Sequence, residues 1–358
     1  MKHICFFAGN IDLGGGTERT LTLVANEMSQ RGYIVTILNL WGGTRPFFAL
    51  GSSIKSVNLF AERISFAKNF LKAVHLLRSY VKANAVDVLV SVESTQSLYA
   101  LPACTGLGVT QVNWEHFNSK VDLGFYPRRI ARYLAAKFSD HIVVLTERDN
   151  GLWQKTLGVR HKISTIPNAI PFSVAVDEGE RKNAMLAVGR FTFQKGFDLL
   201  LEAWRLVARH SADCQLWIVG DGEDKQKLKA LVEEYQLGGS VIIFEPTSTI
   251  SDYYSQAKWF CLSSRFEGFP MVLLEASSWG LPIVAFDCDT GPAEIITHRA
   301  NGLLCPPEDT DALSAAIVEA FSMSDDAYKC MQSMARTTAE KFTLPRIGDM
   351  WVNLFEET

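Results

Sequence analysis

Residues 259–286 read WFCLSSRFEGFPMVLLEASSWGLPIVAF and place a helical segment between two short apolar runs. The two runs, residues 259–262 and 283–286, contain no charged side chain, which is typical of strands that are buried on both faces. Pro270 precedes the helical segment, and proline suits the first position of a helix because its missing N–H removes no hydrogen bond there. We therefore predict a helix that begins at Pro270 and connects two strands of a parallel sheet.

The same alternation continues in both directions along the chain. Strands are predicted at residues 3–8, 33–40, 86–92, 185–188, 215–219 and 241–244, and helices at residues 17–31, 67–82, 197–210 and 224–235. This order predicts an α/β fold with two doubly wound, Rossmann-like domains that face each other across a cleft. We place the domains at residues 1–167 and 168–341, joined through IPNAIPF (166–172), and expect a helix at about 342–358 to pack back on the first domain.

The composition excludes several classes of protein. The chain has 358 residues, of which 47% are apolar and 21% charged, so it is neither disordered nor collagen-like nor a coiled coil. Its seven cysteines include no C-x-x-C pair, which favours free thiols over disulfides or a zinc site. No run of 18 apolar residues and no signal-peptide pattern occurs, so we expect a cytoplasmic protein.

The charge is distributed unevenly between the two predicted domains. Residues 1–168 carry 19 Lys and Arg against 11 Asp and Glu, whereas the rest of the chain carries 16 against 28. The first part therefore has a net charge of +8 and the second of −12, hidden within a total of −4. Such an asymmetry suggests that the two domains meet different partners.

A loop with two cations follows the strand predicted at residues 185–188. Residues 187–197 read AVGRFTFQKGF, which places Arg190 directly after the strand and Lys195 before the next helix. Such a pair can neutralise a diphosphate, the lysine as a point charge and the arginine as a forked donor. The alternative is a pair of solvated surface cations.

Two glutamates flank the start of the helix predicted at Pro270. Glu267 lies in the loop before it and Glu275 about a turn and a half inside it, so they would contact different parts of a ligand. Near the helix N-terminus a phosphate could bind backbone N–H groups, those of Gly268, Phe269, Met271 and Val272. The alternative is one capping and one solvated glutamate.

Three further patterns are weaker. The run Gly14–Gly16 before Thr17 suits a close approach of the backbone to a ligand or a simple tight turn, and it lacks the spacing of a dinucleotide site or a P-loop. His116, in QVNWEHFN, is either catalytic or a structural histidine. Asp287 and Asp289 form a D-x-D string, but no third metal ligand is apparent nearby.

Together these motifs resemble glycosyltransferase family 4, whose members are retaining enzymes of the GT-B fold that use nucleotide sugars. In chain order, the resemblance is carried by GGGTER (14–19), IPNAI (166–170), VGRFTFQKG (188–196), WIVGDGE (217–223), FEGFPMVLLEASSWGLPIVAFD (266–287) and NGLLCPPED (301–309). The resemblance covers nearly the whole chain.

The resemblance implies roles for single residues. Arg190 and Lys195 would hold the donor diphosphate and stabilise the leaving group. Glu267 would lie at the transferred sugar, Glu275 would bind the ribose hydroxyls, and His116 would lie near the sugar.

The resemblance also implies binding by backbone groups. Residues 269–272, which include Pro270, would hold phosphate oxygens, and Gly15 and Gly16 would bring their loop close to the diphosphate and the acceptor. No metal or other cofactor is expected, because GT-B enzymes generally act without a divalent cation.

GGGTER together with DCDTGPAEII (287–296) is similar to bacterial members that build surface polysaccharide units on a polyprenyl diphosphate lipid. The expected donor is a UDP-linked hexose or N-acetylhexosamine, with GDP-mannose second. Two features depart from the family pattern: residues 245–247 (EPT) replace a glycine-containing turn near the base, and Thr17 follows the glycines where alanine is commoner. A nucleotide-sugar epimerase and a non-catalytic sugar-nucleotide-binding protein remain alternatives.

Two basic segments of the first domain suggest contact with the inner face of the cytoplasmic membrane. Residues 63–84 contain five Lys or Arg and no acidic residue, interleaved with apolar side chains. A second cluster has Arg128, Arg129, Arg132 and Lys137 beside aromatic residues. Basic amphipathic segments can rest on anionic headgroups, and the alternative is a solvated helix face. No nucleic-acid partner is expected.

Overall fold

The computed structural model describes all residues except 123, 160–161, 172–178 and 210–212. The chain divides into two compact units, each with its own sheet. Unit 1 comprises Met1–Ala169 and Leu344–Thr358, and unit 2 comprises Ile170–Thr343. Residue 172 of the predicted connection and residue 210 of a predicted helix lie outside the described residues.

Unit 1 is built on a parallel sheet of seven strands. In chain order these are β1 (His3–Ala8), β2 (Ile34–Trp41), β3 (Lys55–Phe60), β4 (Val88–Val92), β5 (Thr110–Trp114), β6 (His141–Val144) and β7 (Ile163–Thr165). Across the sheet they are arranged β3-β2-β1-β4-β5-β6-β7, so the strand order reverses between β1 and β4. Ligands of open α/β sheets bind outside the carboxyl ends of strands at such a reversal.

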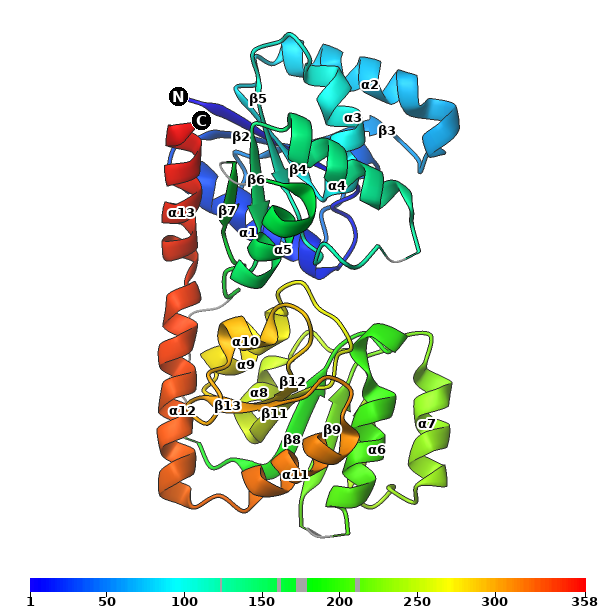
Figure 1. The fold of residues 1–358 in the computed structure, drawn as a ribbon, viewed down its shortest axis with the longest axis vertical. Coiled ribbons are helices and arrows are strands. Elements are labelled where there is room, and N and C mark those ends of the chain that lie inside the picture. The colour runs from blue at the N-terminus through cyan, green and yellow to red at the C-terminus, as the bar shows by residue number, and fades with distance from the viewer. Residues whose placement is uncertain (123, 160–161, 172–178, 210–212) are drawn as a thin grey trace. The chain divides into compact units, whose positions relative to one another are not determined.

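Helices cover the sheet of unit 1 (Figure 1). They are α1 (Gly16–Gln30), α2 (Phe66–Ala83), α3 (Ser94–Cys104), α4 (Pro127–Phe138), α5 (Glu147–Leu157) and α13 (Leu344–Glu357). Every residue of β1 is buried, and α1 buries Leu21, Val24 and Met28 at helical spacing. A strand buried along its whole length is what a parallel sheet covered on both faces requires.

Unit 2 repeats this architecture with a parallel sheet of six strands. Its strands are β8 (Lys182–Val188), β9 (Gln215–Val219), β10 (Val241–Phe244), β11 (Ala257–Leu262), β12 (Ile283–Phe286) and β13 (Gly302–Cys305), in the order β10-β9-β8-β11-β12-β13. Its α-helices are α6 (Phe197–Val207), α7 (Lys225–Glu234), α8 (Ser251–Gln256), α9 (Met271–Ser278), α10 (Pro292–Ile295), α11 (Thr310–Phe321) and α12 (Asp325–Ala339). The described residues of unit 2 also form the 3₁₀ turns η1 (Phe193–Lys195) and η2 (Glu340–Phe342).

The predicted α/β fold with two doubly wound sheets is confirmed. Residues 259–286 form β11, α9 and β12, and the two strands pair in parallel with Phe260 opposite Ile283. One detail is wrong: α9 begins at Met271 and not at Pro270, because Pro270 has an extended backbone (φ −73°, ψ 108°) and occupies the N-cap position.

The C-terminal helix α13 belongs to unit 1, where it packs against α1. Trp351 of α13 is fully buried, and its ring centroid lies 4.7 Å from that of Trp114 and 6.5 Å from that of Phe6. At the surface, Arg31, the C-cap residue of α1, forms an ion pair with Asp349 of α13 at 2.6 Å. The last helix of the chain thus completes the core of the unit that contains the first strand.

The cysteines are all free thiols, as predicted, and six of the seven are buried. No helix within the described part of the chain is long and apolar enough to cross a membrane.

The packing of α13 makes Trp351 a main support of unit 1. We expect Trp351→Ala to lower the free energy of unfolding by about 3–5 kcal/mol, because it removes a large buried side chain and leaves a cavity. Met350→Ala, at the exposed neighbouring position, should change it by less than about 1 kcal/mol. Chemical denaturation of both variants checks this, and equal effects would contradict the assignment.

Candidate active site

An ion pair joins the two central loops of unit 2. Lys195 lies in η1, after β8, and Glu267 lies in the loop after β11, the strand next to β8 in the sheet. Lys195 Nζ is 2.7 Å from Glu267 Oε1, and the Glu267 side chain is only 7% exposed. Two residues that are 72 positions apart in the sequence are therefore brought together at the carboxyl ends of adjacent strands.

Short hydrogen bonds hold Glu267 in place from both sides. The Ser264 hydroxyl donates to Glu267 Oε1 at 2.6 Å, and the Thr290 hydroxyl donates to the Glu267 carbonyl oxygen at 2.6 Å. Gly291, with φ +100°, follows Thr290, and a Cβ at this position would lie 2.6 Å from the Pro270 ring. The loop after β12 is thus fitted closely against the loop that carries Glu267.

The loop of Lys195 is fixed by its backbone. The Ser263 hydroxyl donates to the Lys195 carbonyl oxygen at 2.9 Å, and Arg265 N donates to the Gln194 carbonyl oxygen at 2.8 Å. Gly196 has a left-handed backbone (φ +61°), and any Cβ there would collide with the Ser263 carbonyl oxygen. Glycine is therefore required where the lysine loop enters α6.

Arg190 does not join this cluster. It lies two residues after the end of β8 and is exposed, and within the described part of the chain it makes no ion pair. The structure therefore brings Lys195 and Glu267 together and leaves Arg190 accessible to solvent on the same loop.

Glu275 lies one turn inside α9, where it is buried. Its Oε2 atom accepts a hydrogen bond of 2.8 Å from the hydroxyl of Tyr254 on α8. Tyr254 is itself fully buried and stacks on Phe260 of β11, with ring centroids 5.9 Å apart. Glu275 is therefore held in one orientation, and the sequence patterns did not identify Tyr254 as its partner.

The remaining donor-binding residues predicted from sequence surround the start of α9. Gly268, Phe269 and Pro270 form the approach, and Met271 and Val272 form the first turn. Leu273 N donates to the Pro270 carbonyl oxygen at 3.0 Å, which is the first bond of the helix. The N-terminal end of α9 thus lies directly after Glu267, where its dipole favours negative charge.

The glycine loop of unit 1 does not use the conformational freedom of glycine. Gly15 is the N-cap of α1 with φ −89°, and neither Gly14 nor Gly16 has a positive φ. A Cβ on Gly16 would meet no atom within 4 Å, whereas one on Gly14 would press on the Phe47 ring. The loop at the carboxyl end of β1 is exposed at Gly14 and Gly16, whereas a Cβ on Gly15 would collide with Glu18 Oε2.

His116 follows β5 and is 7% exposed. Its ring centroid lies 4.5 Å from that of Trp114, and its buried Nε2 atom has no hydrogen-bond partner among the described residues. Burial lowers the pKa of His116 to about 4, although the neighbouring Glu115 carboxylate acts in the opposite direction. The imidazole is therefore neutral at pH 7.

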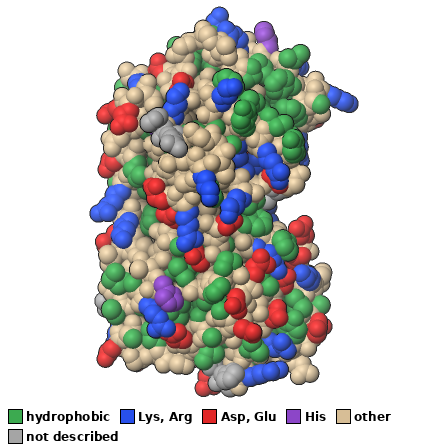
Figure 2. All heavy atoms as spheres, viewed as in Figure 1, with side chains coloured by type: hydrophobic (Ala, Val, Ile, Leu, Met, Phe, Trp, Pro, Cys, Tyr) green, Lys and Arg blue, Asp and Glu red, His purple; other side chains and the backbone are tan. Residues whose placement is uncertain are grey.

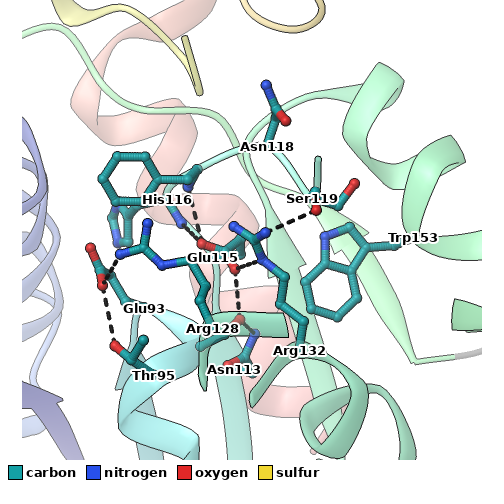
Figure 3. Close-up of polar contacts among 12 residues, drawn as sticks. Glu93, Thr95, Asn113, Glu115, His116, Asn118, Ser119, Arg128, Arg132 and Trp153 are labelled. Carbon is teal, nitrogen blue, oxygen red and sulfur yellow. Dashed lines mark hydrogen bonds and ion pairs between the residues drawn. The ribbon is translucent and has the colours of Figure 1, made fainter. Parts of the chain in front are cut away.

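A buried ion pair fixes the loop that carries His116 (Figure 3). Glu115 Oε1 accepts the backbone N–H groups of His116 and Phe117, both at 3.1 Å, and Glu115 Oε2 lies 2.8 Å from Arg132 Nε. Ser94 also donates to Oε2 at 2.7 Å. Burial alone would raise the pKa of Glu115, but the pairing with Arg132 and these hydrogen bonds lower it below its usual value.

Two arginines of α4 are buried, contrary to the prediction from sequence. Arg128 and Arg132 were predicted to belong to a basic surface, but both are buried, Arg128 against Glu93 (3.1 Å) and Arg132 against Glu115. Burial of a guanidinium is tolerated because each one has a carboxylate partner. Glu93, at the end of β4, is a site candidate that the sequence patterns missed.

Known glycosyltransferases match nearly the whole chain. Residues 14–174 match the family described as Glycosyltransferase Family 4, and residues 172–338 match Glycosyl transferases group 1. An uncharacterized glycosyltransferase of Haemophilus influenzae is 32% identical over 98% of this chain and 99% of its own length. The amylovoran biosynthesis glycosyltransferase AmsD of Erwinia amylovora is 31% identical over 83% of this chain and 84% of its own.

Two further proteins are similar over their full length. One, from Campylobacter jejuni, is the GalNAc-alpha-(1->4)-GalNAc-alpha-(1->3)-diNAcBac-PP-undecaprenol alpha-1,4-N-acetyl-D-galactosaminyltransferase, 25% identical over 100% of this chain and 99% of its own. The other is Anabaena HepE, solved in complex with UDP, with a TM-score of 0.83, 17% identity and full coverage of both chains. The fold of this chain is GT-B.

The buried, neutral His116 has a measurable effect on stability. The unfolded chain takes up a proton on this histidine near the ordinary pKa of 6.5, whereas the folded chain does so only near 4. The wild-type free energy of unfolding therefore falls on acidification through this range. From roughly pH 7.5 to pH 5, the free energy of unfolding of wild type should therefore fall by about 2 kcal/mol more than that of His116→Gln.

Urea denaturation over this pH range checks the expectation. The exposed His75, changed to Gln, serves as the control and should give a curve parallel to wild type. A His116→Gln curve that also runs parallel to wild type would show that His116 is accessible to protons in the folded state.

Proposed function

The chain belongs to glycosyltransferase family 4, and from this membership we propose that it transfers a hexose or an N-acetylhexosamine from a nucleotide sugar to a lipid-linked saccharide. The donor is a UDP-sugar, with GDP-mannose second, and the anomeric configuration is retained. The acceptor belongs to bacterial surface polysaccharide synthesis. The relatives in Erwinia and Campylobacter support this acceptor by their names, and the HepE complex supports UDP.

The observation that carries the proposal is the Lys195–Glu267 pair at the start of α9. The difficult step in sugar transfer is the departure of a nucleoside diphosphate from an anomeric carbon that develops positive charge. Fixed cations and a helix N-terminus aimed at the departing charge stabilise that step. Lys195 and Arg190 supply the cations, and the first turn of α9 supplies the dipole.

The carboxylates have separate tasks in this proposal. Glu267, next to Lys195, accepts hydrogen bonds from hydroxyls of the transferred sugar. Glu275, one turn inside α9, binds the ribose hydroxyls, and the Tyr254 hydroxyl holds its Oε2 atom in one orientation. Neutral His116 offers a ring nitrogen to a sugar hydroxyl without adding charge. No observation favours the epimerase.

We also propose that unit 1 contacts the membrane through α2 and α4, with a surface that differs from the one expected from sequence. Because Arg128 and Arg132 are buried, the exposed face of α4 keeps only two of the four predicted cations, Arg129 and Lys137. They lie beside the exposed Ile130 and Tyr133, and Tyr126 at the N-cap is also exposed. Figure 2 shows hydrophobic side chains gathered where α4 lies in Figure 1. On α2, three lysines are exposed beside two apolar side chains: Lys68, Lys72, Lys82, Phe66 and Leu71.

Donor transfer tests the main proposal. Membranes and radiolabelled UDP- and GDP-sugars are incubated with the protein, and label in the lipid extract is measured. We expect Lys195→Ala and Glu267→Ala each to reduce transfer at least about 100-fold, because each removes charge stabilisation at the reacting centre. Lys229→Ala, an exposed lysine of unit 2, should keep wild-type activity. Isomerised free nucleotide sugar without labelled lipid would refute the proposal.

Vesicle binding tests the proposed membrane surface. We expect the protein to sediment with vesicles containing phosphatidylglycerol and to be released as salt rises, because screening weakens the lysine contribution. Ile130→Glu, on α4, should reduce binding at all salt concentrations, and Met334→Glu, an exposed position of unit 2, should not. Binding that is unchanged in Ile130→Glu would exclude α4 as the contact.

A further inference from the structure

Glu93 has a backbone conformation that side chains rarely adopt. It follows β4 directly, with φ +73° and ψ 143°, and serves as the N-cap of α3 without a capping hydrogen bond from its side chain. This region of backbone space is otherwise occupied almost only by glycine, and residues held there against their preference cluster at functional sites. A glycine would fit the backbone better, so the side chain at this position requires its own explanation.

The Glu93 side chain is only partly matched by its neighbours. Its Oε2 atom lies 3.1 Å from Arg128 Nη2 and accepts the Thr95 hydroxyl at 3.2 Å. The side chain remains 23% exposed, and within the described residues no bond to Oε1 is found. Burial raises the pKa of Glu93, an effect that Arg128 opposes.

Arg128 also has a hydrogen-bonding atom without a partner. Its side chain is 10% exposed and lies over the Phe117 ring, with Cζ 4.5 Å from the ring centroid. Its Nη1 atom is buried and has no hydrogen-bond partner among the described residues. Figure 3 shows the guanidinium of Arg128 reaching from α4 toward Glu93. Buried donors in native proteins nearly always have a hydrogen-bond partner. Arg128 Nη1 is therefore suited to donate to a ligand, and Glu93 Oε1 to accept from one.

The pair lies where unit 1 is expected to bind ligands. Glu93 is at the carboxyl end of β4, next to β1 and thus at the reversal of strand order. Glu18, in the first turn of α1 directly after the glycine loop, is close enough to influence the pKa of Glu93. The partly matched pair and the glycine loop therefore share one edge of the sheet.

The charges around the pair favour a neutral ligand. Two carboxylates, Glu93 and Glu115, already pair with the two buried guanidiniums of α4. The carboxylate of Glu18 is a further negative charge within electrostatic reach. A phosphate or a uronate would add a further negative charge beside these carboxylates, whereas the guanidiniums of Arg128 and Arg132 are already paired. Hydroxyl groups can both donate to Glu93 and accept from Arg128.

We propose that Glu93 and Arg128 bind neighbouring hydroxyl groups of the sugar that receives the transferred residue, and that this sugar is uncharged. This inference rests on the proposed transfer to a saccharide and names the chemical class of its acceptor end. Glu93 accepts a hydrogen bond from one hydroxyl, and Arg128 donates to the next. The strained backbone places the carboxylate between β4 and α4 where both can act.

Binding of simple glycosides tests this proposal. The probes are the octyl glycosides of glucose, galactose, N-acetylglucosamine and N-acetylgalactosamine, with octyl glucuronide as the anionic counterpart of octyl glucoside. Saturation-transfer NMR with the full chain should detect at least one neutral glycoside, and octyl glucuronide should bind at least tenfold more weakly than octyl glucoside. Absence of every neutral signal, or equal binding of the glucuronide, would overturn the proposal.

The variants assign the binding to the pair. Glu93→Gln and Arg128→Lys should each weaken glycoside binding at least tenfold, and Arg129→Lys, at the exposed adjacent position, should not. Wild-type binding in Glu93→Gln would overturn the assignment even if Arg128→Lys fails to fold. Protection of the same samples by UDP or GDP against thermal unfolding reports on unit 2 alone. If neither UDP nor GDP protects the wild type, the proposed transferase function is refuted separately.

Discussion

The ion pair between Lys195 and Glu267 is the interaction on which the arrangement of unit 2 depends. It connects the loops after β8 and β11, the two strands at which the strand order reverses, and Ser264 and Thr290 add hydrogen bonds to the same glutamate. A nearly buried carboxylate is tolerated only when it is paired, so the ion pair stabilises the two loops. It also holds the Lys195 ammonium at the position where the diphosphate is proposed to bind. Folding and the proposed chemistry thus use the same contact.

Unit 1 uses buried charge in a related way. Glu115 and Arg132 form a nearly fully buried pair that orients the His116 loop, whereas Glu93 and Arg128 form a partly exposed pair in which Arg128 Nη1 lacks a partner within the described residues. Arg132 also has a buried nitrogen, Nη2, without a partner among the described residues, so the two pairs differ in exposure: the side chains of the first are 1–3% exposed and those of the second 10–23%, which makes the second accessible to a ligand. The aromatic core around Trp114 and Trp351, to which α13 contributes, supports the strand from which His116 projects.

Much of the fold could be predicted from sequence, because apolar strands such as β11 and β12 must be buried on both faces and the helices between them show regular spacing. Only the family resemblance predicted that Lys195 and Glu267 belong to one site, because 72 positions separate them in the sequence. The burial of Arg128 and Arg132 could not be predicted, because helical periodicity shows which residues share a face but not whether a distant carboxylate meets them. Glu93 and Tyr254 escaped for the same reason: their importance depends on partners from other elements.

Titration of UDP into wild type and Glu267→Gln tests the central claim most directly. In the proposed division of tasks, Lys195 binds the diphosphate, Glu267 binds the sugar, and their ion pair must open before the diphosphate can take the lysine. Calorimetry should therefore show that Glu267→Gln binds UDP at least as tightly as wild type, because Lys195 is released and one negative charge is removed. If Glu267→Gln instead loses UDP affinity, the glutamate is part of the diphosphate site and the division of tasks is wrong.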